Sequence, residues 1–194
     1  MQDEWARRLL WLPPKSMRRQ LMRPIVDRLN SVGLLSAQTV VGQGAMHIVV
    51  SRFYFIRMYM ESLREAVNGN IKVILSDSRD VVFQGNPFGR IQEQVVCGLE
   101  DIRNGHRELT NSWLVGMYGE DVAQKLRDTR VVCAGFIIGT IEAVSDLVDN
   151  VLSEVAERFG HCAYRVGPDQ AALNKLIYQD GLPVDLVENG SPLL

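Results

Sequence analysis

The chain has 194 residues, 46% of them hydrophobic and 23% charged, which is enough apolar material for one domain with a buried core. The net charge of −2 argues against a nucleic-acid-binding protein, because such proteins normally carry a concentrated basic surface. The three cysteines, Cys97, Cys133 and Cys162, have no metal-ligand spacing, so we expect reduced, packed thiols in a cytoplasmic protein.

The first 35 residues mix basic and apolar side chains and are predicted to be a basic helical segment, broken at Pro13-Pro14. Two interpretations remain open for it. The favoured one is a pair of short core helices with a solvated basic face. The other is a weak peripheral contact with an anionic membrane surface. No run approaches the roughly 18 to 20 apolar residues that a membrane-spanning helix needs.

Helices and strands are predicted to alternate along the rest of the chain. In the first half, the patterns predict a loop at 31–46 with a short strand at 39–41, a helix at 51–67, and strands at 73–76 and 95–99. In the second half, they predict a loop around Trp113 and Tyr118, a helix at 120–127, a strand at 131–138, a long helix, a helix at 169–178 and a strand at 183–187. One face of the long helix is formed by Ile141, Val144, Val148, Leu152 and Val155. This alternation is typical of a layered α/β sheet.

The apolar strand at 73–76 ends in a polar turn that contains Asp77, Arg79 and Asp80. Carboxylate oxygens suit Mg²⁺ or Mn²⁺, which proteins often share with substrate phosphates. Arg79 would pair with a phosphate, or would neutralise the two acids in a structural network. Acidic residues at strand ends also cap turns and helices. The spacing alone does not choose between these alternatives.

This stretch resembles the aspartate motif of nucleotide-sugar glycosyltransferases of the GT-A fold, in a group that reads "SDxRDVVFQxxPF". Three further segments resemble that group in the expected order: the helix at 51–59, the Cys-Ala-Gly segment at 133–139 and the "DQxxLN" helix start at 167–174. The resemblance implies a single-domain, GT-A-like (Rossmann-like) layered α/β/α sheet over 36–194. Relative to that pattern the chain is expected to be shortened at both ends, because an opening strand with a glycine-rich turn and a late metal-binding segment are not found.

The resemblance also implies roles for particular residues. It implies donor binding by Arg52, Ser76, Asp77, Arg79, Cys133, Ala134 and Gly135, a metal site at Asp77 and Asp80, and catalytic contacts from Asp169 and Gln170. Each has a structural alternative. Arg52 would be a surface residue, Asp169 a helix cap, and Gly135 a place where two backbones approach closely. Trp113 and Tyr118 would stack on a sugar or, as favoured, would pack in the protein.

The expected function is therefore transfer of a sugar from a nucleotide-diphosphate donor to an acceptor hydroxyl, assisted by Mn²⁺ or Mg²⁺. The expected acceptor is a glycan, a lipid or a protein, and no nucleic-acid partner is expected. The protein is expected in the cytoplasm, at the periphery of a membrane if its N-terminus binds one. One alternative is an inactive nucleotide-sugar-binding module of the same fold. Another is a Mg²⁺-dependent phosphohydrolase, although position 79, where its second acid would stand, is Arg.

Overall fold

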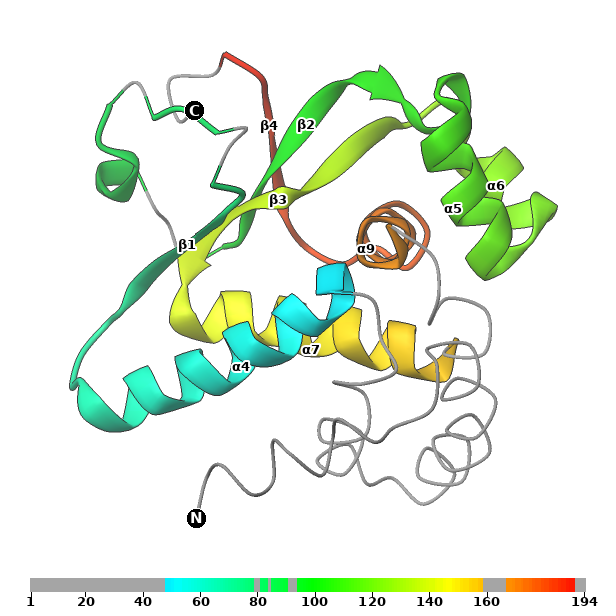
Figure 1. The fold of residues 1–194 in the computed structure, drawn as a ribbon. Coiled ribbons are helices and arrows are strands. Elements are labelled where there is room, and N and C mark those ends of the chain that lie inside the picture. The colour runs from blue at the N-terminus through cyan, green and yellow to red at the C-terminus, as the bar shows by residue number, and fades with distance from the viewer. Residues whose placement is uncertain (1–47, 79–80, 84, 91–93, 159–166, 191–194) are drawn as a thin grey trace.

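The computed structural model describes residues 48–78, 81–83, 85–90, 94–158 and 167–190, and these form a mixed α/β arrangement (Figure 1). The predicted segment at 1–35 and the predicted strand at 39–41 lie outside them. In chain order the elements are α4 (Ile48–Ala66), β1 (Lys72–Ser76), the 3₁₀ helix η1 (Pro87–Arg90), β2 (Val96–Arg103), the 3₁₀ helix η2 (Asn104–His106), α5 (Glu108–Tyr118), α6 (Glu120–Leu126), β3 (Arg130–Thr140), α7 (Ile141–Glu157), α9 (Pro168–Tyr178) and β4 (Asp185–Glu188).

The four described strands form one mixed sheet in the order β1-β3-β2-β4. The long strand β3 pairs antiparallel with both of its neighbours, β1 and β2, whereas β2 and β4 run parallel. A Rossmann-like sheet is built mainly from parallel strands, so the pairing around β3 departs from that expectation. The broader prediction, a mixed α/β domain, is confirmed.

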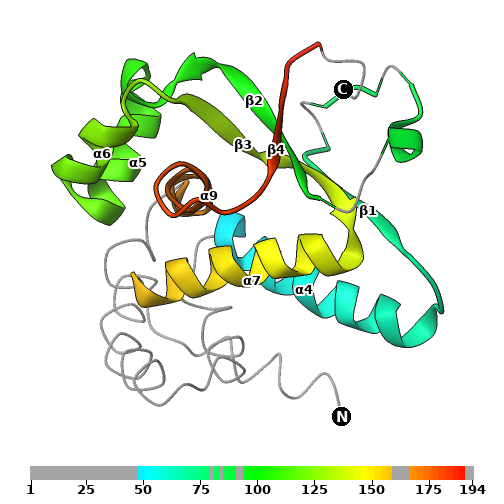
Figure 2. The ribbon, with the colours of Figure 1, turned by 180° about the vertical axis from the view of Figure 1, so that it is seen from behind.

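Helices α4, α7 and α9 cover one face of the sheet, with α4 and α7 side by side (Figure 1 and Figure 2). The opposite face carries a small apolar cluster of Val96, Phe136 and Ile138. In the ranges that the structure describes, no α-helix covers this second face, where an α/β/α arrangement would place one. None of the described helices is both long enough and apolar enough to cross a membrane.

The helix α7 shows why this side of the sheet holds the core. The Thr140 hydroxyl accepts a hydrogen bond from the Ala143 amide at 3.3 Å, which caps the helix directly at the end of β3. The predicted face of the helix is confirmed, because its five apolar residues are all 3% exposed or less. Burial of a side chain of this size stabilises the fold by about 1.5–3 kcal/mol.

The predictions made from hydrophobic spacing are confirmed to within a few residues, with one error. Trp113 and Tyr118 do not lie in a loop, because both belong to α5. This helix buries Thr110, Leu114 and Met117, at helical spacing. Its polar start and its internal glycine weaken the helical pattern, and tertiary packing overrides that weak propensity.

Asn174 joins α9 to the rest of the fold. Its side-chain oxygen accepts hydrogen bonds from the Val132 amide at 2.9 Å and the Asn104 amide group at 3.0 Å. Its side-chain nitrogen donates to the carbonyls of Val132 at 3.0 Å and Gln170 at 2.8 Å. Because Asn174 is 1% exposed, these groups have no access to water in its place. The start of α9 is therefore held in a fixed position against β3.

We predict that Asn174→Ala lowers the free energy of unfolding by about 3 kcal/mol, because it leaves buried backbone and amide groups unsatisfied. Asn150→Ala is the matched control, since Asn150 also donates to the carbonyl four residues earlier, that of Asp146, but is exposed. The control should change stability by about 0.5 kcal/mol or less. Urea unfolding of both variants measures the difference, and equal losses would contradict the role assigned to Asn174.

Candidate functional site

The site forms where β3 leaves the regular ladder. Between the pairs Cys97–Ile137 and Leu99–Val132, β3 advances five positions while β2 advances two. The four residues between these pairs, 133–136, lie opposite Gly98 alone and contain the Cys-Ala-Gly segment. A bulge redirects side chains and breaks the alternation of a strand. Ala134 accordingly packs into the core while Cys133 faces a cavity on the other side.

Arg52 connects this bulge to two carboxylates. Its Nη1 lies 2.6 Å from Asp77 Oδ1, and its Nη2 lies 2.9 Å from Asp169 Oδ2. Nη2 also donates to the Ala134 carbonyl at 3.1 Å. The guanidinium group suits this geometry because its donors form a rigid fork. One side chain from α4 thus links the end of β1, the bulge of β3 and the start of α9.

Gly135 allows Asp77 to approach the bulge. The Asp77 amide donates to the Gly135 carbonyl at 2.8 Å, which extends the β1–β3 pairing by one residue. A Cβ atom on Gly135 would lie 2.3 Å from Asp77 Oδ2, a distance at which one of them must move. The expectation was a close approach of two backbones at this glycine, whereas the atoms nearest to the added Cβ belong to the side chain of Asp77.

Asp169 is the most buried charged group of the site. Its side chain is 2% exposed, and among the described residues its Oδ1 has no hydrogen-bond partner. Burial raises the pKa of this carboxyl above its ordinary value, while the Arg52 guanidinium acts in the opposite direction. Asp169 is not the N-cap of α9, because that position is taken by Gly167.

The two aromatic residues considered as sugar-stacking groups have packing roles. A Cβ on Gly167, whose φ is 89°, would lie 2.1 Å from the Trp113 ring, so the indole packs directly against the residue that begins α9. The Tyr118 ring lies under the side-chain cations of Arg158 at 5.3 Å and Lys175 at 5.7 Å. These placements favour packing over stacking on a ligand.

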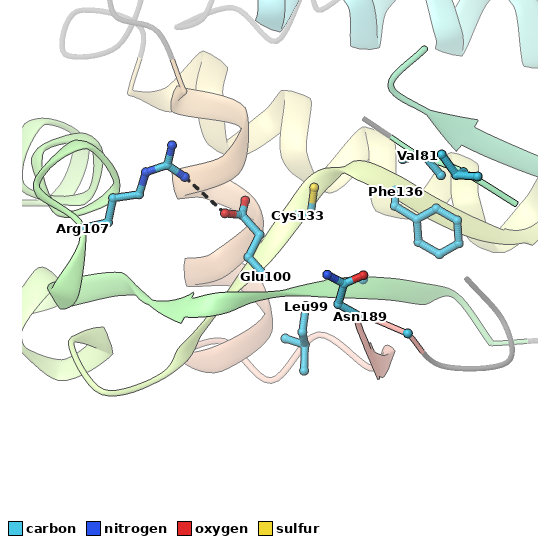
Figure 3. A pocket seen from close by; sticks show the side chains of 10 residues that line it. Val81, Leu99, Glu100, Arg107, Cys133, Phe136 and Asn189 are labelled. Carbon is cyan, nitrogen blue, oxygen red and sulfur yellow. Dashed lines mark hydrogen bonds and ion pairs between the residues drawn. The ribbon is translucent and has the colours of Figure 1, made fainter. Parts of the chain in front are cut away.

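Two cavities adjoin the bulge. The smaller, of about 250 Å³, is lined by most of the predicted donor-binding residues, namely Arg52, Ser76, Asp77, Ala134 and Gly135. The larger, of about 490 Å³, contains Cys133 and is shown in Figure 3. The structure therefore brings residues 52, 76–77 and 134–135 to one cavity, while Cys133 lines the other. Arg79 and Asp80 lie outside the described residues.

Gln170 points toward Glu100, a residue that the sequence analysis missed. The Gln170 Nε2 donates to Glu100 Oε1 at 3.0 Å, and Arg107 Nη1 lies 3.3 Å from Glu100 Oε2. Figure 3 shows Arg107 reaching toward Glu100 beside Cys133. A signal was present in the sequence, because Glu100 follows the apolar run 95–99 in the way that Asp77 follows the run 73–75.

The cysteine thiols are free in the described residues, with Cys97 buried and Cys133 partly buried. Burial raises the pKa of Cys97 to about 12. The pKa of Cys133 is raised mainly by burial, and the nearby charges of Glu100 and Asp77 add to the increase. Burial thus disfavours the thiolate form of both side chains. Cys162 lies outside the described residues.

Of the two predicted metal ligands, Asp77 and Asp80, the described residues include Asp77. Asp77 has a 45% exposed side chain, and its Oδ2 makes no hydrogen bond to another described residue, so this oxygen is available to a cation while Oδ1 binds Arg52. In the ranges that the structure covers, no group of three or more His, Cys, Asp or Glu side chains is arranged to hold a metal. A complete site would need Asp80 or ligands from the substrate.

We predict that Gly135→Ala displaces the Asp77 carboxylate and destabilises the protein by about 2 kcal/mol. Gly85→Ala is the control, because a Cβ there would meet no atom within 4 Å and its backbone is not in the left-handed region. In an Asp77→Ala background the cost of Gly135→Ala should fall, since the carboxyl atoms nearest to the new Cβ are gone. Urea unfolding of the double-mutant cycle tests this, and strictly additive losses would contradict it.

A second prediction concerns pH. Because the folded-state pKa of Asp169 lies above the ordinary value of 3.8, this group's contribution to stability falls as the pH rises through and above that value. Removing Arg52 raises that pKa further. Arg52→Met should therefore cost about 3 kcal/mol at pH 7 and less near pH 4. Adding Asp169→Asn should restore part of the loss at pH 7. Urea unfolding at both pH values measures this, and a pH-independent loss would contradict it.

The function of the site has to be inferred from its geometry. No family model, curated protein or solved structure gives a significant match to this chain. The functional argument consequently depends on Arg52, Asp77, Asp169 and the two cavities beside the β3 bulge.

Proposed function

We propose that this chain is a glycosyltransferase of the GT-A fold, which transfers a sugar from a nucleotide-diphosphate donor to an acceptor hydroxyl. The observation that carries the proposal is the position of Arg52. Its guanidinium lies between Asp77 and Asp169, at the end of β1, and lines a cavity with Ser76 and the bulged backbone. Ligands of α/β proteins commonly bind beyond strand ends of this kind.

The charges of this cluster indicate what the ligand requires. Two carboxylates and one guanidinium leave one negative charge, so an anionic diphosphate entering the smaller cavity would be repelled unless a further cation accompanied it. Asp77, through its available Oδ2, and Asp80 would hold that cation. A divalent ion, when bound, neutralises charge that develops on the leaving diphosphate. We therefore propose Mn²⁺ or Mg²⁺ as the cofactor.

Side chains of the protein would make the remaining contacts with the donor and the acceptor. Arg52 would donate a hydrogen bond to a phosphate oxygen from an N–H group that Asp77, Ala134 and Asp169 leave unused. Ser76, exposed at the end of β1, would offer a hydroxyl to the same ligand. Among the described residues the buried Oδ1 of Asp169 has no hydrogen-bond partner, and this oxygen would accept a hydrogen bond from a sugar or acceptor hydroxyl. Gln170 would fix the neighbouring carboxylate, Glu100.

Isothermal calorimetry of UDP and GDP, with and without Mn²⁺, tests this function. We expect one nucleotide to bind when Mn²⁺ is present and to bind much more weakly without it. Asp77→Asn and Asp80→Ala should each weaken that binding about tenfold or more, because each removes a charged contact. The matched control is Asp146→Asn, an exposed aspartate on α7 away from both cavities at the bulge.

The possible outcomes separate the candidate functions. Metal-dependent binding followed by transfer to an acceptor supports the enzyme. Metal-dependent binding without transfer to any acceptor tried favours the inactive nucleotide-sugar-binding module. Absence of binding by a protein shown to be folded by circular dichroism contradicts the proposed donor site.

A further inference from the structure

We propose that the larger cavity binds an uncharged pyranose ring, and that Glu100 is the carboxylate that accepts hydrogen bonds from its hydroxyl groups. This inference deepens the proposed function and rests on it for the origin of the sugar. The ring would belong either to the donor or to the acceptor, and both present the same chemistry to Glu100.

The first argument is the position in which Glu100 is held. One of its oxygens accepts from Gln170 at 3.0 Å and the other lies 3.3 Å from Arg107, so both donors restrict the carboxylate to one orientation. A carboxylate has about four sites for accepted hydrogen bonds, so two remain for a ligand. The side chain is 27% exposed and lines the cavity, which leaves those sites accessible.

The second argument concerns charge. Glu100 and Arg107 form an ion pair on the cavity wall, so this wall has little net charge and offers both an acceptor and a donor. A neutral polyhydroxylated ligand fits such a wall better than a phosphate does, because its hydroxyl groups donate to Glu100 and accept from Arg107, whereas an ionised phosphate only accepts. The smaller cavity, with Arg52, is the better place for the diphosphate.

The third argument is the shape of the cavity. Its volume of about 490 Å³ falls within the range of about 300–1,000 Å³ that is usual for small-molecule sites. Val81, Val82 and Phe136 form an apolar part, and Asn189 adds an amide, which in the view of Figure 3 lies between Glu100 and Phe136. A pyranose has an apolar ring face and polar edges, so it matches a wall of this composition.

The fourth argument is the proximity of the two cavities. The Asp77 amide donates to the Gly135 carbonyl at 2.8 Å, only two residues after Cys133. The backbone next to Cys133, at Ala134 and Gly135, lines the smaller cavity, while Cys133 itself lines the larger one. A sugar beside Glu100 would therefore lie next to a diphosphate beside Arg52.

Saturation-transfer NMR on the full chain provides the test. The probes are the methyl glycosides of glucose, galactose, mannose and N-acetylglucosamine, together with UDP and the UDP derivatives of the same sugars. We expect Glu100→Ala to abolish the signal of the glycoside that the wild type binds, or to remove the gain in affinity of a UDP-sugar over UDP. Loss of the first identifies an acceptor sugar, and loss of the second identifies the donor sugar.

Two variants make the result specific. Glu100→Gln keeps the shape of the side chain and should weaken the same interaction at least several-fold, which guards against misfolding of the alanine variant. Glu142→Ala is the matched control, because Glu142 is an exposed glutamate on α7 that lines neither of the two cavities at the bulge. It should leave both signals unchanged.

The outcomes also separate this proposal from the function on which it rests. UDP binding should be lost in Asp77→Asn and retained in Glu100→Ala. If UDP binds but the variants of Glu100 bind every glycoside and UDP-sugar like the wild type, the assignment of Glu100 is overturned while the donor site stands. If neither UDP nor GDP binds in the presence of Mn²⁺ but a glycoside binds and depends on Glu100, the donor site fails and the sugar pocket stands. If no sugar probe binds to the folded wild type, the pocket is refuted.

Discussion

The arrangement of the site depends on the need to neutralise Asp169 inside the protein. A carboxylate that is almost fully buried is costly unless a cation and hydrogen bonds compensate it, and Arg52 supplies both. The same guanidinium also holds Asp77 and the carbonyl of Ala134. As a result, α4, the end of β1, the bulge of β3 and the start of α9 have one common point of attachment. A shift in any of these four segments would break a charged contact.

Packing makes this electrostatic arrangement possible. Gly135 leaves room for Asp77 at the bulge, and Gly167 leaves room for the Trp113 ring at the start of α9. Asn174 then fixes α9 to Val132 on the strand that carries the bulge. The irregular part of the sheet is thus held by many specific contacts. Its irregularity positions the polar groups, and these contacts hold the backbone that carries them.

Much of this could be predicted from the sequence, because the signals are local. The apolar face of α7 and the polar residues that follow the strand at 73–76 are visible in short windows. The ion bridge at Arg52 was not predicted, since nothing local indicates that a residue in a helix meets one that lies 117 positions later. Glu100 was missed for a related reason, because its importance comes from Gln170 and Arg107 around it. The helix α5 was missed because packing, rather than propensity, stabilises it.

The wide separation of the Arg52 contacts along the chain has a consequence for how the protein folds. The partners of Arg52 lie 25, 82 and 117 positions away, so the cluster closes long loops and is complete only after β1, β3 and α9 have assembled. Partly folded forms would contain the helices without a finished cluster. Any molecule that recognises the complete cluster binds the native state alone, and by mass action it would shift the folding equilibrium toward that state.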